Sequence, residues 1–116
     1  MKLILAIIRP ERLEAVQESL QRVLDEGDRY RLTIDNVEGH GAAAGEVEIF
    51  RGRQIRPRLS PRVRVMIAVN DAYVEPAVEA ILRGARTGQV GDGKIFVTPL
   101  EECIRIRTGE RGGKAV

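Results

Sequence analysis

Two patterns of apolar residues alternate along this chain and restrict the folds that it can adopt. Nearly continuous apolar runs at residues 2–8 and 63–69 are typical of buried strands. Each run is followed by residues that can begin a helix, a proline in one case and an Asn–Asp pair in the other. Segments 13–24 and 74–85 then repeat apolar residues at helical spacing. The chain therefore predicts two strand–helix units.

Further segments have the character of strands. A strand is expected from about Tyr30 to Gly39, with Leu32, Ile34 and Val37 as its apolar residues, and another at 95–97. Residues 103–107 alternate apolar and basic residues, as a half-exposed strand does. We expect Gly27 to end the first helix and Asn70-Asp71 to cap the second. The order strand, helix, strand, long loop, strand, helix, strand is the βαββαβ pattern of α+β, ferredoxin-like folds, in which two helices cover one face of a sheet.

Length and composition exclude several classes of protein. The 116 residues suffice for one domain, 1–116. No apolar run approaches the roughly 18 residues of a membrane span, and the opening run is too short for a signal peptide. The one cysteine, Cys103, cannot form an internal disulfide, which favours a reducing, cytoplasmic location. No metal site is expected, because one cysteine and one histidine do not make a ligand set.

The net charge is only +2, yet basic residues are concentrated in two places. One is the long loop at 41–61, which lacks apolar periodicity and is of a length that is usually functional or disordered. The other comprises Lys94 in a Gly-Asp-Gly-Lys turn, Arg105 and Arg107. Glycines let backbone N–H groups approach an anion, and the cations add charge, so these residues can form a phosphate site. An ordinary turn and a solvated strand face are the alternative interpretation.

Several motifs together resemble a known family. Residues 87–97 read Thr-Gly-Gln-Val-Gly-Asp-Gly-Lys-Ile-Phe-Val and are followed by Arg-Ile-Arg-Thr-Gly-Glu at 105–110. With the segments 6–10, 37–41 and 50–52, they closely resemble the PII nitrogen-regulatory signal proteins over nearly the whole chain. The resemblance implies the same ferredoxin-like fold and a homotrimer in which ATP and ADP compete for a site in each cleft between subunits.

The resemblance also implies which residues bind the nucleotide. The four residues of the Gly-Asp-Gly-Lys turn, with Arg105 and Arg107, would surround the phosphates, and Thr33 would contact adenine. His40 takes the place of a family aromatic residue, although a solvent-exposed histidine at a strand end is the alternative. The complete set of candidate nucleotide-binding residues is Ile7, Thr33, Gly39, His40, Gly41, Arg62, Thr87, Gly88, Gly91, Asp92, Gly93, Lys94, Arg105 and Arg107.

The loop at 41–61 corresponds to the family's T-loop, the partner-binding arm. Arg51 matches the tip arginine that plugs a transporter pore in channel regulators, and Ile55 replaces the tyrosine that some members have uridylylated. The candidate partner-binding residues are Glu48, Phe50, Arg51, Arg53, Arg56 and Arg58. At the end of the domain, glycines mark residues 108–116 as a loose C-terminal tail.

The chain departs from the family pattern at the start of the long loop. Ala42, Ala43 and Ala44 replace an Arg-Gln-Lys sequence, and Arg62 replaces a lysine that binds 2-oxoglutarate. Methyl groups cannot coordinate a hard cation or pair with a dicarboxylate. We therefore expect Mg²⁺ and 2-oxoglutarate sensing to be weakened or lost, while adenine nucleotide binding remains.

The expected function is that of a regulator without enzymatic activity, because no catalytic dyad or triad is recognisable. Its partner would be a membrane transporter or a metabolic enzyme. The alternatives are a slow nucleotidase, a structural trimer without ligand, and a nucleic-acid-binding protein that uses the arginine-rich loop. Nucleic acid is not expected as a partner, because few aromatic residues are available for stacking on bases.

Overall fold

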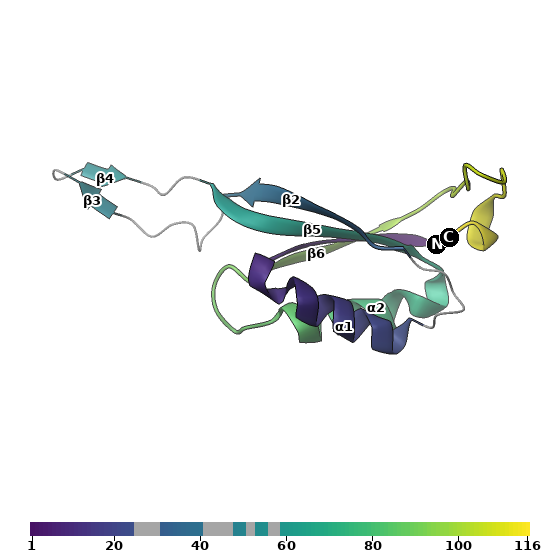
Figure 1. Ribbon diagram of the computed structural model, residues 1–116, viewed down its shortest axis with the longest axis horizontal. Coiled ribbons are helices and arrows are strands. Elements are labelled where there is room, and N and C mark those ends of the chain that lie inside the picture. Colours follow the sequence, from purple (N-terminus) through teal and green to yellow (C-terminus); the bar gives the residue numbers. More distant parts are fainter. Residues whose placement is uncertain (25–30, 41–47, 51–52, 56–58) are drawn as a thin grey trace.

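The computed structural model describes residues 1–24, 31–40, 48–50, 53–55 and 59–116. Its main sheet has four antiparallel strands in the order β2-β5-β1-β6. The strands are β1 (Lys2–Ile8), β2 (Thr33–Gly39), β5 (Ser60–Val69) and β6 (Gly93–Pro99). Two helices, α1 (Leu13–Val23) and α2 (Val74–Ala85), lie side by side on one face of this sheet (Figure 1). The predicted α+β, ferredoxin-like arrangement is confirmed.

Both helices begin with a short 3₁₀ turn, and their ends differ from the prediction. The turns are η1 (Pro10–Arg12) and η4 (Asp71–Tyr73). The first helix ends at Val23 because Leu24 already has extended backbone angles, so it stops before Gly27, which lies outside the described residues. The Asn70 side chain makes no capping hydrogen bond to the second helical segment. Its amide instead donates to the Gly113 carbonyl at 3.2 Å and so holds the C-terminal segment.

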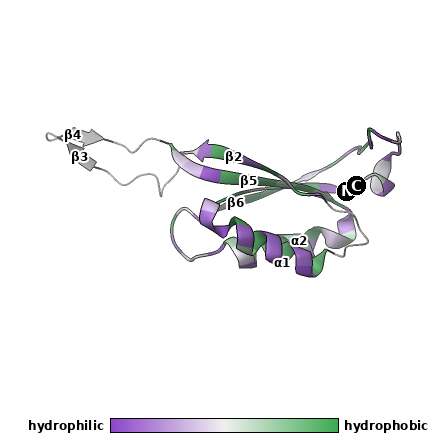
Figure 2. Ribbon diagram, in the orientation of Figure 1, coloured by the Kyte–Doolittle hydropathy of each residue, from purple (hydrophilic) through white to green (hydrophobic). Residues whose placement is uncertain are grey.

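The core lies between the two helices and the central strands. Every second residue of β1 and β5 faces the helices, and Ile4, Ile8 and Ile67 are among the largest fully buried side chains. In Figure 2 the colour of hydrophobic residues runs along much of the sheet and α2, whereas α1 is banded. The helices approach closely at Gly84, where an added Cβ would lie 2.6 Å from Val16 Cα. This glycine therefore sets the distance between α1 and α2.

Both described helices lie on one face of the sheet, and the opposite face has no helical layer among the described residues (Figure 1). Strand register places Thr33, Met66, Leu5 and Phe96 in one row across all four strands on this face. Phe96 is 53% exposed although it is a large apolar residue. We call this row the open-face row. No described helix is long and apolar enough to cross a membrane.

Two short strands lie within the segment that the sequence predicted to be an irregular loop. They are β3 (Glu48–Phe50) and β4 (Arg53–Ile55), and they pair antiparallel with each other, outside the main sheet (Figure 1). The predicted loop also extends too far, because β5 already begins at Ser60.

The predicted strand at 103–107 is wrong. Its backbone forms a single bridge, Ile104 to Arg111, and then turns, with the Gly109 N–H donating to the Arg105 carbonyl at 2.7 Å. Alternation of side chains across a strand therefore does not apply to Arg105 and Arg107. The tail that follows is held rather than loose: it forms η5 (Gly112–Lys114), and the Gly112 N–H donates to the Cys103 carbonyl at 2.9 Å.

Candidate functional site

The glycine-rich loop between α2 and β6 depends on backbone conformations that other residues rarely adopt. Gly88, Gly91 and Gly93 have φ values of 86°, 100° and 101°. A Cβ added to Gly93 would also lie 1.7 Å from the Ile7 carbonyl oxygen. The loop can therefore run directly against the end of β1 only because Gly93 carries no side chain.

The Asp92 carboxylate holds this loop together. It accepts hydrogen bonds from the Thr87 hydroxyl, from the backbone N–H groups of Thr87 and Gly88, both at 2.9 Å, and from Arg9 Nε at 3.1 Å. The Thr87 hydroxyl first, and then the N–H groups and Arg9, hold the pKa of Asp92 well below its usual range. Arg9 also donates to the Val90 carbonyl at 2.7 Å. The contacts of Asp92 thus shape the loop that the sequence analysis predicted to surround a phosphate.

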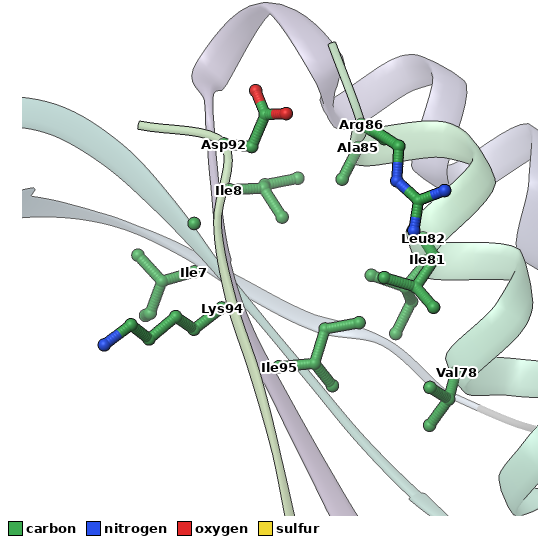
Figure 3. A pocket seen from close by; sticks show the side chains of 11 residues that line it. Ile7, Ile8, Val78, Ile81, Leu82, Ala85, Arg86, Asp92, Lys94 and Ile95 are labelled. Atoms are coloured by element: carbon green, nitrogen blue, oxygen red, sulfur yellow. The ribbon is translucent and has the colours of Figure 1, made fainter. Parts of the chain in front are cut away.

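Beside the loop lies a cavity of about 400 Å³, which we call the loop hollow. Figure 3 shows apolar side chains of α2 and Ile95 facing one another, whereas Lys94 and Ile7 project to the other side of the sheet. Lys94 is exposed and makes no hydrogen bond or ion pair with any residue that the structure describes. The residues lining the hollow are Ile7, Ile8, Val78, Ile81, Leu82, Ala85, Arg86, Asp92, Gly93, Lys94 and Ile95.

The two predicted C-terminal arginines line a separate cavity of about 370 Å³, the arginine hollow. Arg105 is held by Glu110 at 3.2 Å and by the Lys114 carbonyl at 3.2 Å. Arg107 is exposed and has no such partner in the described ranges. The residues lining the hollow are Arg31, Ala68, Cys103, Arg105, Arg107, Ala115 and Val116.

Sequence reasoning missed Arg31 as a member of this cluster. The available signal was its place two residues before Thr33, which puts both on the same side of an extended chain.

The remaining predicted residues lie elsewhere. Thr33, Gly39 and Arg62 are on β2 and β5, and His40 is exposed just after β2. An added Cβ on Gly39 would lie 3.1 Å from Arg62 Cγ, so these two are neighbours. Neither hollow includes them.

The predicted loop residues divide between described and undescribed positions. Glu48, Phe50 and Arg53 lie on β3 and β4. Gly41, Arg51, Arg56 and Arg58 lie outside the described residues. The structure therefore adds no side-chain geometry for the partner-binding candidates.

The two hollows share no lining residue, and both contain cations. Guanidinium and ammonium groups bind phosphate and carboxylate oxygens, and the apolar side chains of the loop hollow can pack against an uncharged ring. No group of three or more potential metal-ligating side chains occurs in the described part of the chain. The cations and apolar side chains of the two hollows are chemically suited to an anion that carries an apolar ring.

Comparison with known proteins identifies the family. The family described as "Nitrogen regulatory protein P-II" matches residues 1–110. The chain belongs to the P-II family. Nitrogen regulatory protein GlnK1 of Methanosarcina mazei is 48% identical over 118 residues, which cover 100% of this chain and 97% of the relative. Nitrogen regulatory protein P-II of Azospirillum brasilense is 45% identical over 116 residues, 100% of both chains.

The match confirms the resemblance predicted from the sequence motifs. Residues 1–110 contain the whole sheet, the glycine-rich loop, Arg105 and Arg107, so the features of both hollows lie mainly in the part typical of P-II proteins. Only Ala115 and Val116 of the arginine hollow lie beyond the matched segment.

Proposed function

We propose that this P-II chain is a regulatory signal protein without enzymatic activity, which binds ATP or ADP at the boundaries between copies of itself in a homotrimer. The observation that carries the proposal is the separation of its cations. Lys94 and Arg107 lack counterions among the described residues, and they line two different hollows of one chain. We therefore propose that one polyphosphate is bound by Lys94 of one copy and Arg107 of another.

The chemistry of each hollow fits a part of a nucleotide. The glycine-rich loop offers a backbone that can approach phosphate closely, and Lys94 adds a positive charge beside it. The arginine hollow adds guanidinium groups, which pair with phosphate oxygens through two parallel hydrogen bonds. Thr33 stands at the edge of the open-face row, where its hydroxyl can contact a base.

The open-face row supports association between copies. Met66, Leu5 and Phe96 form a continuous apolar band across the sheet, and a face of this kind is normally covered in a stable protein. Covering it with the same face of other copies would bury apolar area, which stabilises an oligomer by about 25 cal/mol per Å². A homotrimer would also bring the arginine hollow of one copy toward the loop hollow of the next.

The segment 41–61 is proposed as the arm that acts on a partner protein, a membrane transporter or a metabolic enzyme, in the cytoplasm. Its arginines suit an acidic surface on that partner. Bound nucleotide can control the arm only if it favours one conformation of the arm over another. The factor by which nucleotide changes the affinity for the partner should then equal the factor by which the partner changes the affinity for nucleotide. With Ala42–Ala44 in the arm, Mg²⁺ and 2-oxoglutarate are proposed to have little influence.

Calorimetry of the purified full chain with ATP and with ADP tests the proposal. We expect saturable binding of both, and a loss of at least tenfold in affinity in Arg107→Gln, because a charged hydrogen bond is removed. Arg111→Gln is the matched control, since Arg111 pairs with Glu102 and lines neither hollow. Unchanged affinity in Arg107→Gln would refute the phosphate role, and a monomer by light scattering would refute the shared cleft.

The same preparation distinguishes the alternative functions. Steady-state ATP turnover that is lost in Lys94→Gln would indicate a nucleotidase. Tight binding of nucleic acid that weakens steeply with salt would indicate a nucleic-acid-binding protein instead.

A further inference from the structure

A third hollow lies in the helical layer, between α1 and the end of α2. It has a volume of about 200 Å³, and we call it the helix hollow. It shares no residue with the loop hollow or the arginine hollow. Its lining residues are Arg12, Ala15, Glu18, Ser19, Arg22, Arg83 and Gly84.

Small residues account for the gap. Ala15 and Gly84 contribute almost no side chain, and the backbones of the two helices meet at this point. Arg12, Ser19 and Arg22 follow one another at helical spacing, so they lie on the same side of the first helical segment. Arg83 approaches from α2. The lining therefore combines long cationic side chains with small residues.

The charges of the helix hollow are not balanced. Three arginines face one acid, Glu18. Arg12 donates through Nε to the Gly84 carbonyl at 2.8 Å, which fixes its position at the crossing. Arg22 and Arg83 are exposed, and neither forms a hydrogen bond or ion pair within the described ranges. The local excess is two positive charges, which matches the charge of a phosphate dianion.

A buried hydroxyl provides the second, independent observation. Ser19 is only 8% exposed, and it is the one buried polar side chain among the residues whose burial the structure describes. Its side chain has no hydrogen-bond partner in the part of the chain that the structure describes, although it lines the helix hollow. A buried hydroxyl without a partner costs free energy, and such groups are usually satisfied by protein, water or ligand. A ligand oxygen in the hollow would satisfy it.

We propose that the helix hollow is a second anion site, which binds a compact phosphate group through Arg12, Arg22, Arg83 and the Ser19 hydroxyl. The phosphate group can be inorganic phosphate or the phosphate of a small monoester, since the hollow is open on one side and too small for a nucleotide. Guanidinium groups on two helices would clamp this group, so occupation of the site would tie α1 to the end of α2. That end leads directly into the glycine-rich loop.

Calorimetry with inorganic phosphate, repeated with glycerol phosphate, tests the site in the full chain without nucleotide. We expect saturable binding. Arg83→Gln should lower the affinity for phosphate about tenfold, and the double variant Arg22→Gln/Arg83→Gln should lower it further, because charged hydrogen bonds are lost. Both side chains are exposed, so these variants should fold. Binding of both ligands identifies the phosphate group as the recognised part, and binding of inorganic phosphate alone limits the site to the free ion.

Three further variants locate the bound phosphate. Glu18→Gln removes the opposing charge and should tighten binding a few-fold, whereas Ser19→Ala should weaken it. Arg111→Gln removes the same charge from a residue that pairs with Glu102 and lines none of the three hollows, and it should leave this binding unchanged. Absence of saturable heat would overturn the proposal. So would a loss of phosphate binding in Arg107→Gln that equals the loss in Arg83→Gln, because the phosphate would then lie in the arginine hollow.

Discussion

Replacing Gly93 by alanine tests the close contact between the glycine-rich loop and β1. Two costs follow from the structure. The residue has a φ of 101°, and a side chain in such a conformation costs about 1–3 kcal/mol. The new Cβ would also lie 1.7 Å from the Ile7 carbonyl oxygen, so β6 must move away from β1, and overpacking of this kind costs about 1–3 kcal/mol. We expect a total loss of about 2–5 kcal/mol, the sum of these ranges less some relaxation.

Urea denaturation at fixed protein concentration measures this loss. With a slope of about 1–3 kcal/mol per molar urea, the midpoint should fall by roughly 1–2 M. Gly109→Ala is the matched control, because Gly109 also has a positive φ, 72°, but an added Cβ meets nothing within 4 Å. It should show the conformational cost alone. Equal midpoints for the two variants would refute the argument that the Ile7 carbonyl excludes a side chain from position 93.

Three other predictions concern the core, the loop and the effector. Ile67→Ala should lower the free energy of unfolding by about 2–5 kcal/mol, because Ile67 is only 2% exposed. Ile106→Ala is the control and should lower it by about 0.5 kcal/mol or less, because Ile106 is 100% exposed; urea denaturation measures both free energies. Because the pKa of Asp92 is lowered on folding, its contribution to stability is complete above about pH 4 and declines as the pH falls toward the folded pKa. Urea midpoints measured from pH 7 down to pH 2 should therefore fall less at acid pH in Asp92→Asn than in the parent, and parallel curves would contradict the role of Asp92. 2-Oxoglutarate added to the ATP-loaded protein should give no saturable heat at sub-millimolar concentration, and a micromolar isotherm would contradict the reasoning from Ala42–Ala44.

Local periodicity sufficed to predict the main elements of the fold. The stripe at 74–85 has the period of a helix, and the continuous run at 2–8 has the length of a buried strand and is followed by Pro10. Alternation failed at 103–107, because a strand also needs a neighbour to pair with, and this segment finds only the single bridge to Arg111. Asn70 failed as a cap for a related reason: its amide reaches a carbonyl far along the chain, which no local rule anticipates.

Of the candidate sites, those formed by one local segment were predictable from the sequence, and those assembled from distant segments were not. The glycine-rich loop was recognisable from the sequence because its positive φ angles require glycine. Arg31 and the helix hollow were not, because their members come from segments that only the fold brings together. A single arginine on a helix, such as Arg22, looks like part of a solvated face until its neighbours across the crossing are known.

The contacts of Arg9 have a consequence for protein engineering. This residue, at the end of β1, donates both to the Asp92 carboxylate and to the Val90 carbonyl, so the glycine-rich loop is fastened to a strand at the other end of the sequence. Transplanting residues 86–94 alone into another scaffold would leave the carboxylate without its cationic partner. A portable version of the loop must carry an arginine on the adjoining strand, which makes it a two-segment module.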